Sequence, residues 1–291
     1  MTSAKFFRFL RCIANAPIFK RSYVQHSTKF ALLSSSAFAI YKGCVHPVTC
    51  QQLKQKVNNK LIIEEADRMY NSNLHPRELY QHLKQYEITS DAEILWRICR
   101  AARDLALKVV DISKDEKKAL VYEAFEFAKK ALEADDYNFA SHKWYAITIG
   151  DVGDYEGTKI KISNAFIIRD HLQRASELNP KDATTLHCLG MWCFVFADMP
   201  GWQRTIASFI FGTPPTSTFP EAAEYFMQAE RVDPNFYSIN LLMLGKTYMK
   251  MNDKKRAMLF FDRTIHYPIV TAEDEQAKKE AEELLKEVIG K

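Results

Sequence analysis

A pattern of large and small residues that begins at Ser238 constrains the fold of this chain more than any other feature. Its members stand at positions 4, 7, 8, 11, 20 and 24 of the pattern: Leu241, Leu244, Gly245, Tyr248, Ala257 and Phe261. Small residues at positions 8 and 20 allow two antiparallel helices to touch, and the large residues fill the space beside that contact. The spacing therefore predicts a helical hairpin of about 34 residues.

This spacing is typical of the tetratricopeptide repeat (TPR), and upstream segments carry parts of it. The first half of a repeat is matched by Leu186, Leu189 and Gly190, and the second half by Ala222, Phe226, Ala229 and Asp233-Pro234. These halves are out of phase, which indicates an insertion near 197–220. Further upstream Trp144 and Asn179-Pro180 mark another repeat, in which Gly150, Gly153 and Gly157 indicate an insertion near 150–163.

The sequence therefore predicts an all-α fold, a right-handed array of about four degenerate TPR-like helical hairpins over 61–291. Ser113-x-x-Glu116 and Thr271-x-x-Asp274 are capping boxes that predict helix starts. One apolar stripe follows the second box and predicts a C-terminal capping helix: Ala277, Ala281, Leu284, Leu285 and Val288. With only 9 Gly and 10 Pro in 291 residues, the composition also favours helices over sandwiches and Rossmann-type phosphate loops.

Residues 1–60 differ from the remainder of the chain in charge. Ten basic residues and no acidic one precede Glu64, whereas residues 64–291 carry 30 basic and 36 acidic residues. Phe6, Phe9, Leu10 and Ile13 recur on one helical face, opposite Lys5, Arg8 and Arg11. This leader is predicted to be a mitochondrial targeting segment. The alternative is a basic tail that binds acidic surfaces, and the apolar stretch 30–41 is too short to span a bilayer unaided.

No arrangement of residues in the sequence predicts catalysis. The six cysteines form no C-x-x-C pair, which indicates reduced thiols and an intracellular protein. Gly245-Lys246-Thr247 lacks the leading glycine of a phosphate-binding loop, and His187, Cys188 and Cys193 have no second ligand pair for a metal. We expect a non-enzymatic protein without cofactor, metal or nucleic-acid partner.

Function is instead predicted to reside in a groove lined by the first helix of each hairpin. Positions 2, 5, 9, 12 and 13 of the repeat face this groove and give His142, Tyr145, Ile149, His187, Met191, Phe194, Leu242, Lys246, Met249 and Lys250. Met and aromatic residues suit an adaptable surface for an amphipathic helix or an acyl chain. The alternative is that these residues are core, with the 197–220 insertion or the last helix filling the groove.

Two other segments are candidates for partner contacts. A basic cluster, Lys246, Lys250, Lys254, Lys255 and Arg256, offers positive charge to an acidic partner. The 197–220 insertion contains a short apolar helix between Met199-Pro200-Gly201 and Gly212. It could cover the groove, insert into a membrane surface or extend the core.

The repeats, with the segments 186–190 and 221–234, closely resemble the regulator of microtubule dynamics family over residues 61–289. The resemblance implies a non-enzymatic, microtubule-associated protein. Its implied location is the mitochondrion, the cytoplasm with its microtubules and spindle, or both. A longer family member is implied to tether mitochondria to the endoplasmic reticulum through a TPR domain that accepts phospholipid. Three classes of function stay open: a microtubule-associated regulator, a lipid-binding or lipid-transfer module, and a mitochondrial peptide-binding adaptor.

Overall fold

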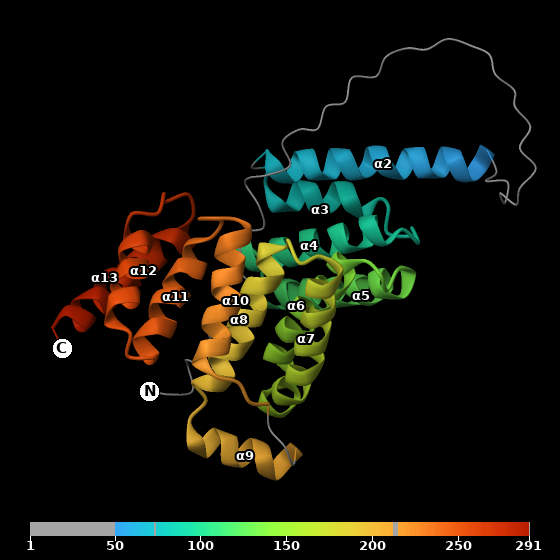
Figure 1. The fold of residues 1–291 in the computed structure, drawn as a ribbon. Helices are drawn as coiled ribbons and strands as arrows, with labels where there is room; N and C mark the ends of the chain where they lie inside the picture. The colour runs from blue at the N-terminus through green and yellow to red at the C-terminus, as the bar shows by residue number, and fades with distance from the viewer. Residues whose placement is uncertain (1–49, 73, 212–214, 291) are drawn as a thin grey trace, which may run out of the picture.

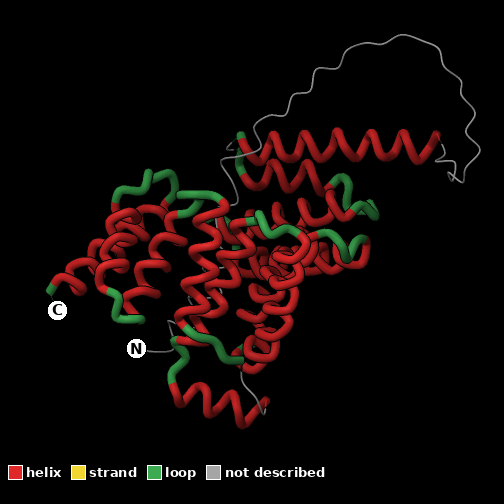
Figure 2. The backbone as a smooth tube through the Cα atoms, viewed as in Figure 1, coloured by secondary structure: helices red, strands yellow, loops and turns green. Residues whose placement is uncertain are grey.

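The structure is a computed structural model that describes residues 50–72, 74–211 and 215–290. The predicted targeting segment at the start of the chain lies outside the described residues. In the described part the chain forms helices joined by short connections, and no strand is present (Figures 1 and 2).

Ten of the helices form five antiparallel hairpins. Their bounds are α2 (Cys50–Asn71) with α3 (Pro76–Lys84), α4 (Ala92–Lys108) with α5 (Lys114–Ala134), α6 (Phe139–Glu156) with α7 (Thr158–Leu178), α8 (Ala183–Ala197) with α10 (Phe219–Val232), and α11 (Ser238–Lys250) with α12 (Lys254–Ile265). This is the predicted all-α array of TPR-like hairpins. It includes one hairpin more than the four expected, and α2 begins at Cys50, inside the range that we assigned to the leader.

The two predicted insertions take different forms. Near 150–163 the extra residues lengthen α6 and α7, which are joined by Gly157 alone, at a φ of 90° that favours glycine. Near 197–220 the insertion contains the expected short helix, α9 (Gly201–Phe211), between α8 and α10. Figure 1 shows α9 along the lower edge of the array, below α7 and α8, and it contacts α7.

The helix ends follow local rules that the sequence contained. At Thr271 the side chain accepts a hydrogen bond from the Asp274 N–H, and the Asp274 carboxylate accepts one from the Thr271 N–H, which confirms that capping box. Ser113 caps α5 by accepting from the Glu116 N–H, but the Glu116 carboxylate binds Arg77 of α3, so only half of that predicted capping box forms. Each such bond satisfies an N–H group that has no partner within its helix.

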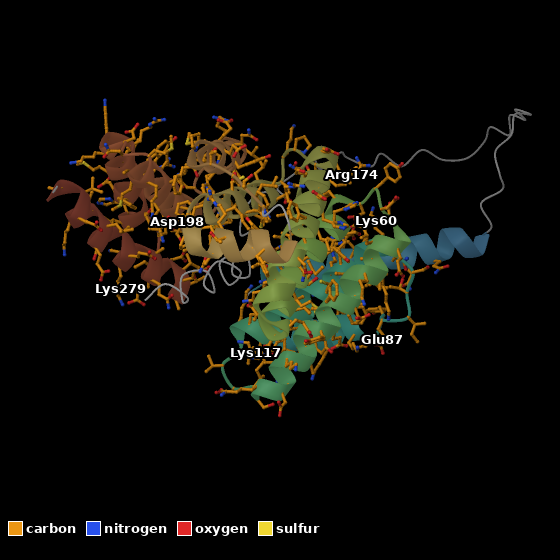
Figure 3. All side chains as sticks on the ribbon, turned by 90° about the horizontal axis from the view of Figure 1, so that it is seen from below. Lys60, Glu87, Lys117, Arg174, Asp198 and Lys279 are labelled. Atoms are coloured by element: carbon orange, nitrogen blue, oxygen red, sulfur yellow. The ribbon has the colours of Figure 1, made fainter. Side chains whose placement is uncertain are left out.

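The last helix, α13 (Ala272–Ile289), seals the end of the array. It packs against α11 and α12, and buries Ala277, Ala281 and Val288. Its opposite face is charged, as expected for a terminal helix with no neighbour beyond it. Figure 3 shows charged side chains such as Lys60, Glu87 and Lys279 on the outside of the array.

Candidate functional site

The first helices of successive hairpins, α2, α4, α6, α8 and α11, form one layer of the array. Buried ion pairs join neighbours within it. Between α4 and α6, Arg103 Nε donates to Asp151 Oδ2 over 2.6 Å. At the start of α8, both carboxylate oxygens of Asp182 lie 3.1 Å from Lys143 Nζ of α6. These pairs connect adjacent hairpins, and in each pair the buried acid and base neutralise each other.

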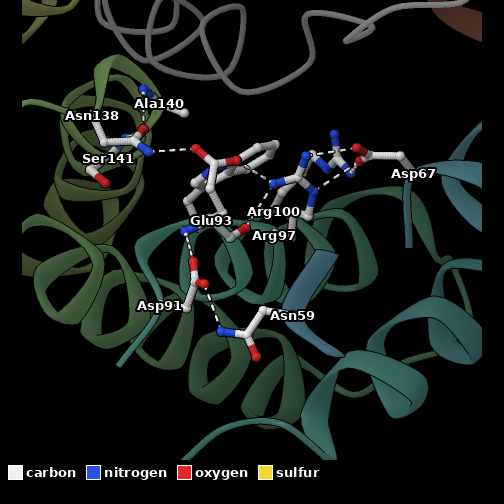
Figure 4. Close-up of polar contacts among 10 residues, drawn as sticks. Asn59, Asp67, Asp91, Glu93, Arg97, Arg100, Asn138, Ala140 and Ser141 are labelled. Atoms are coloured by element: carbon white, nitrogen blue, oxygen red, sulfur yellow. Dashed lines mark hydrogen bonds and ion pairs between the residues drawn. The ribbon is translucent and has the colours of Figure 1, made fainter. Parts of the chain in front are cut away.

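A cluster of polar and aromatic side chains lies where α2, α4 and α6 adjoin (Figure 4). Arg97 of α4 donates from Nε and Nη2 to the Asp67 carboxylate of α2, at 2.9 and 2.6 Å. Its Nη1 donates to Glu93 Oε2 at 2.6 Å, and Asn138, which caps α6, donates to the other oxygen of Glu93. Both carboxylates keep about two fifths of their side-chain surface exposed.

Arginine side chains stack on aromatic rings beside these carboxylates. The Arg97 guanidinium lies 4.1 Å from the Trp96 ring centroid, and that of Arg100 lies 3.7 Å from the Tyr70 centroid. The Arg100 Nε is buried without a hydrogen-bond partner. Sequence reasoning missed this cluster, although charged residues at 93, 97 and 100 in an apolar helix follow the i, i+4, i+7 spacing of one face.

Most of the predicted groove residues are packing residues in this structure. Those with little or no exposed surface are His142, Ile149, His187, Met191, Phe194 and Leu242. The Tyr145 ring lies against Phe125 of α5 and His171 of α7, with centroids 5.4 and 4.4 Å apart. Tyr145 is half-buried against these second helices, and the six other residues offer little surface that a partner could reach. Their role in binding remains a prediction.

Two of the predicted residues are histidines in unusual surroundings. His142 and His171 approach with their Nδ1 atoms 2.8 Å apart, and the Asp136 carbonyl lies 2.8 Å from the His142 Nε2. Burial, together with the neighbouring His142, lowers the pKa of His171 to about 4. His187 is enclosed by Phe226, Phe236 and Tyr237.

His187 connects α8 to α11. Its Nδ1 lies 3.0 Å from Asn240 Oδ1, and Asn240 Nδ2 donates to the Phe226 carbonyl. The Nε2 atom is buried without a partner, and burial lowers the pKa of His187 to about 4 against the opposing effect of Asn240. The side chain therefore stays neutral near pH 7 and holds two repeats together.

The remaining groove candidates lie at the other end of α11. Lys246 donates to Glu280 of α13 over 2.8 Å, and Lys250 donates to Asp198 at the end of α8 over 2.5 Å. Met249, which lies between these lysines in the sequence, is half-buried. Both lysines of this group are therefore neutralised by acids of the same chain.

The other three members of the basic cluster form what we call the basic corner, Lys254, Lys255 and Arg256. They occupy the first turn of α12, and all three are exposed. Arg256 donates to Asp253 over 2.6 Å and lies 4.3 Å from the centroid of the Tyr248 ring. Within the described residues, Lys254 and Lys255 form no ion pair and face solvent, with the Asp253 carboxylate as the acid next to them in the sequence.

Cys188 and Cys193, which lack a second ligand pair in the sequence, pack in the core together with Cys99. Cys99, Cys188 and Cys193 are free thiols and buried. Burial raises the pKa of Cys188 to about 12 and that of Cys193 to about 11, so both are protonated at neutral pH. No group of three or more His, Cys, Asp or Glu in the described part is placed to hold a metal ion. None of the described helices is both long and apolar enough to cross a membrane.

Comparison with known proteins agrees with this architecture. A family model described as "Regulator of microtubule dynamics protein 1-3" matches residues 62–289. Regulator of microtubule dynamics protein 1 from Bos taurus is 48% identical over 274 residues, 94% of this chain and 84% of the bovine protein. The Homo sapiens protein of the same name is 56% identical over 190 residues, 65% of this chain and 60% of the human protein.

Among solved structures, a thermophilic TPR protein of Thermus thermophilus shares the fold. It superposes with a TM-score of 0.52 at 13% sequence identity, over 76% of this chain and 97% of that protein. The similarity shows a TPR-like array. From the extent of the family match and the identity to its members, the chain belongs to the regulator of microtubule dynamics family.

Proposed function

We propose that this protein is a non-enzymatic, microtubule-associated regulator whose basic corner, Lys254, Lys255 and Arg256, contacts the acidic surface of tubulin. The names of its relatives support a role at microtubules. The observation that carries the assignment to these residues is the placement of free positive charge at the start of α12.

Basic residues are unfavourable at that position. The first turn of a helix exposes N–H groups and the positive end of the helix dipole, and acidic residues are preferred there. The first turn of α12 contains no acid, whereas α13 has three at the equivalent place. Asp253 caps the helix and pairs with Arg256, but in the described part of the chain Lys254 and Lys255 form no ion pair. An acidic partner would neutralise these two lysines.

The test is co-sedimentation with microtubules at several salt concentrations. The full chain should pellet at low salt and lose binding as salt increases, because exposed charges interact over about 10 Å at 0.1 M ionic strength. Lys254→Glu with Lys255→Glu should abolish pelleting. This variant should be no less stable than the parent, because it places acids at a helix start.

Lys129→Glu with Lys130→Glu makes the same change of charge on α5, away from the corner, and should pellet like the parent. Equal losses in both variants would mean that only net charge matters. Loss confined to Arg8→Glu with Arg11→Glu would assign binding to the leader. The alternative function, lipid held in the groove, requires Met191 and Phe194 to open from their buried positions.

A further inference from the structure

Helix α9 has one face packed on the array and another that nothing in the described chain covers. Ala207 is fully buried, whereas Phe209, two residues later and on the other side of the helix, is 93% exposed. The packed side is held in part by Arg204, whose Nη2 lies 3.3 Å from the Phe196 carbonyl of α8. The exposed phenyl ring is therefore on a positioned helix and not at a chain end.

Phe209 belongs to an apolar pattern that continues beyond one residue. Trp202 and Ile206 precede it by seven and three positions in the sequence, the spacing of one helical face. The helix that α9 contacts, α7, exposes Ile160 and Ile167, which are also seven positions apart. Phe209, Ile160 and Ile167 are thus three exposed apolar residues on two contacting helices, and a group of such residues marks an interaction surface more than a single one does.

The charge of the segment restricts the kind of partner. Between Met199 and Pro220 the only charged residue is Arg204, and its guanidinium donates to the Phe196 carbonyl on the packed side. A protein surface that binds an apolar helix usually adds complementary polar contacts at the rim, and this segment offers almost none. Insertion into the surface of an uncharged phospholipid bilayer depends on the apolar area buried at the acyl boundary and needs no charged partner.

The position of α9 also suits a flat partner. It lies along the lower edge of the array, beyond the ends of α7 and α8, and not between hairpins (Figure 1). Gly201 begins the helix, and Pro214 and Pro215 follow its end in the sequence. A planar surface could thus contact α9 without displacing the other helices.

From the exposed face and the charge of α9 we infer that this helix is a peripheral docking site for a phospholipid surface, with Phe209 inserted at the interface. This inference goes beyond the proposed microtubule contact and involves none of the residues of the basic corner. It requires no opening of the hairpins and no spanning segment.

The test uses the full chain and vesicles of phosphatidylcholine alone, in flotation at 0.5 M salt. These conditions suppress electrostatic binding by the basic leader but leave apolar insertion intact. The parent should float with the vesicles. Phe209→Asp should reduce the bound fraction by about tenfold or more, since burial of a phenylalanine ring is worth about 1.5–3 kcal/mol. Phe209→Leu should retain most of the binding.

Ile88→Asp is the matched control, because Ile88 is 95% exposed in the connection between α3 and α4. It should float like the parent. Three results would each overturn the inference: no flotation of the parent, equal flotation of Phe209→Asp, or an equal decrease in Ile88→Asp. Light scattering without vesicles gives a fourth test. If the particle mass of Phe209→Asp is lower than that of the parent, a second copy of the chain covers this face, and the inference is rejected.

Discussion

Gly245 of α11 lies against the ring of Phe261 of α12 so closely that a Cβ atom at position 245 would stand 2.5 Å from Phe261 Cδ1. Gly190 of α8 and Phe226 of α10 repeat the relationship, with a corresponding distance of 2.6 Å. Both rings are fully buried and cannot turn away. In each hairpin the absence of one side chain therefore sets how closely the two helices approach.

Gly245→Ala should destabilise the protein by about 2 kcal/mol, although alanine is the better helix former by about 1 kcal/mol. The contact with the Phe261 ring outweighs the gain in helix propensity. Urea unfolding measures the difference. Gly201→Ala is the control, because a Cβ there meets no atom within 4 Å, and this variant should unfold like the parent or slightly later. Equal behaviour of the two variants would contradict the packing argument.

Phe261→Ala should cost about 3–5 kcal/mol, because the lost ring leaves a cavity between α11 and α12. Leu259→Ala removes an apolar side chain from the same helix, but that side chain is 53% exposed, so its unfolding midpoint should change little. Thermal unfolding followed by circular dichroism compares them. Similar melting of both variants would mean that the last hairpin does not contribute to the cooperative unit.

The contact of Gly245 with Phe261 could be predicted from the sequence because the two residues occur at a fixed offset within one hairpin, whereas the insertion near 197–220 changes that offset for Gly190 and Phe226. The contacts between hairpins could not. Arg97 and Asp67 are 30 residues apart in the sequence, and Arg103 and Asp151 are 48 apart. Whether the side chains of such a pair meet depends on how successive hairpins are rotated relative to each other. The side of α6 that carries Tyr145 was equally hard to assign, because the insertion near 150–163 lengthens that helix and hides the repeat register.

The leader can be tested separately from the folded array. Residues 1–30 fused to a reporter should direct it to mitochondria, because the segment combines an apolar face with basic residues and no acid. Arg8→Glu with Arg11→Glu reverses charge on the polar face and should leave the reporter in the cytosol. Fluorescence microscopy gives the result. A reporter that never enters mitochondria would favour the basic-tail interpretation.

Stability should decrease between pH 7 and pH 5 through His187. Its pKa is about 4 in the folded protein and 6.5 when unfolded, so the unfolded chain binds a proton in this range and the folded chain does not. The free energy of unfolding should be about 2 kcal/mol lower at pH 5 than at pH 7, and the full loss of this contribution is reached only below pH 4. His187→Gln should show a correspondingly weaker pH dependence in urea unfolding. The exposed His266→Gln should behave like the parent, and a His187 variant that also did so would contradict the assignment.

The buried pair of Arg103 and Asp151 gives the sharpest test of how the first helices are held together. Asp151→Ala should cost about 3–5 kcal/mol, because it leaves the Arg103 guanidinium buried without its partner, and the Nη2 of that group already lacks one. Arg103→Met with Asp151→Leu should recover most of the loss, since well-packed apolar side chains can replace a buried ion pair. Urea unfolding of the parent, the two single variants (Arg103→Met and Asp151→Leu) and the double variant gives the coupling between the positions.

A double variant no more stable than Asp151→Ala would mean that the pair specifies the α4–α6 geometry beyond its charge balance. A small effect of Asp151→Ala would mean that water reaches Arg103 and that the contacts of other residues, such as Asn138 with Glu93, hold these hairpins in place.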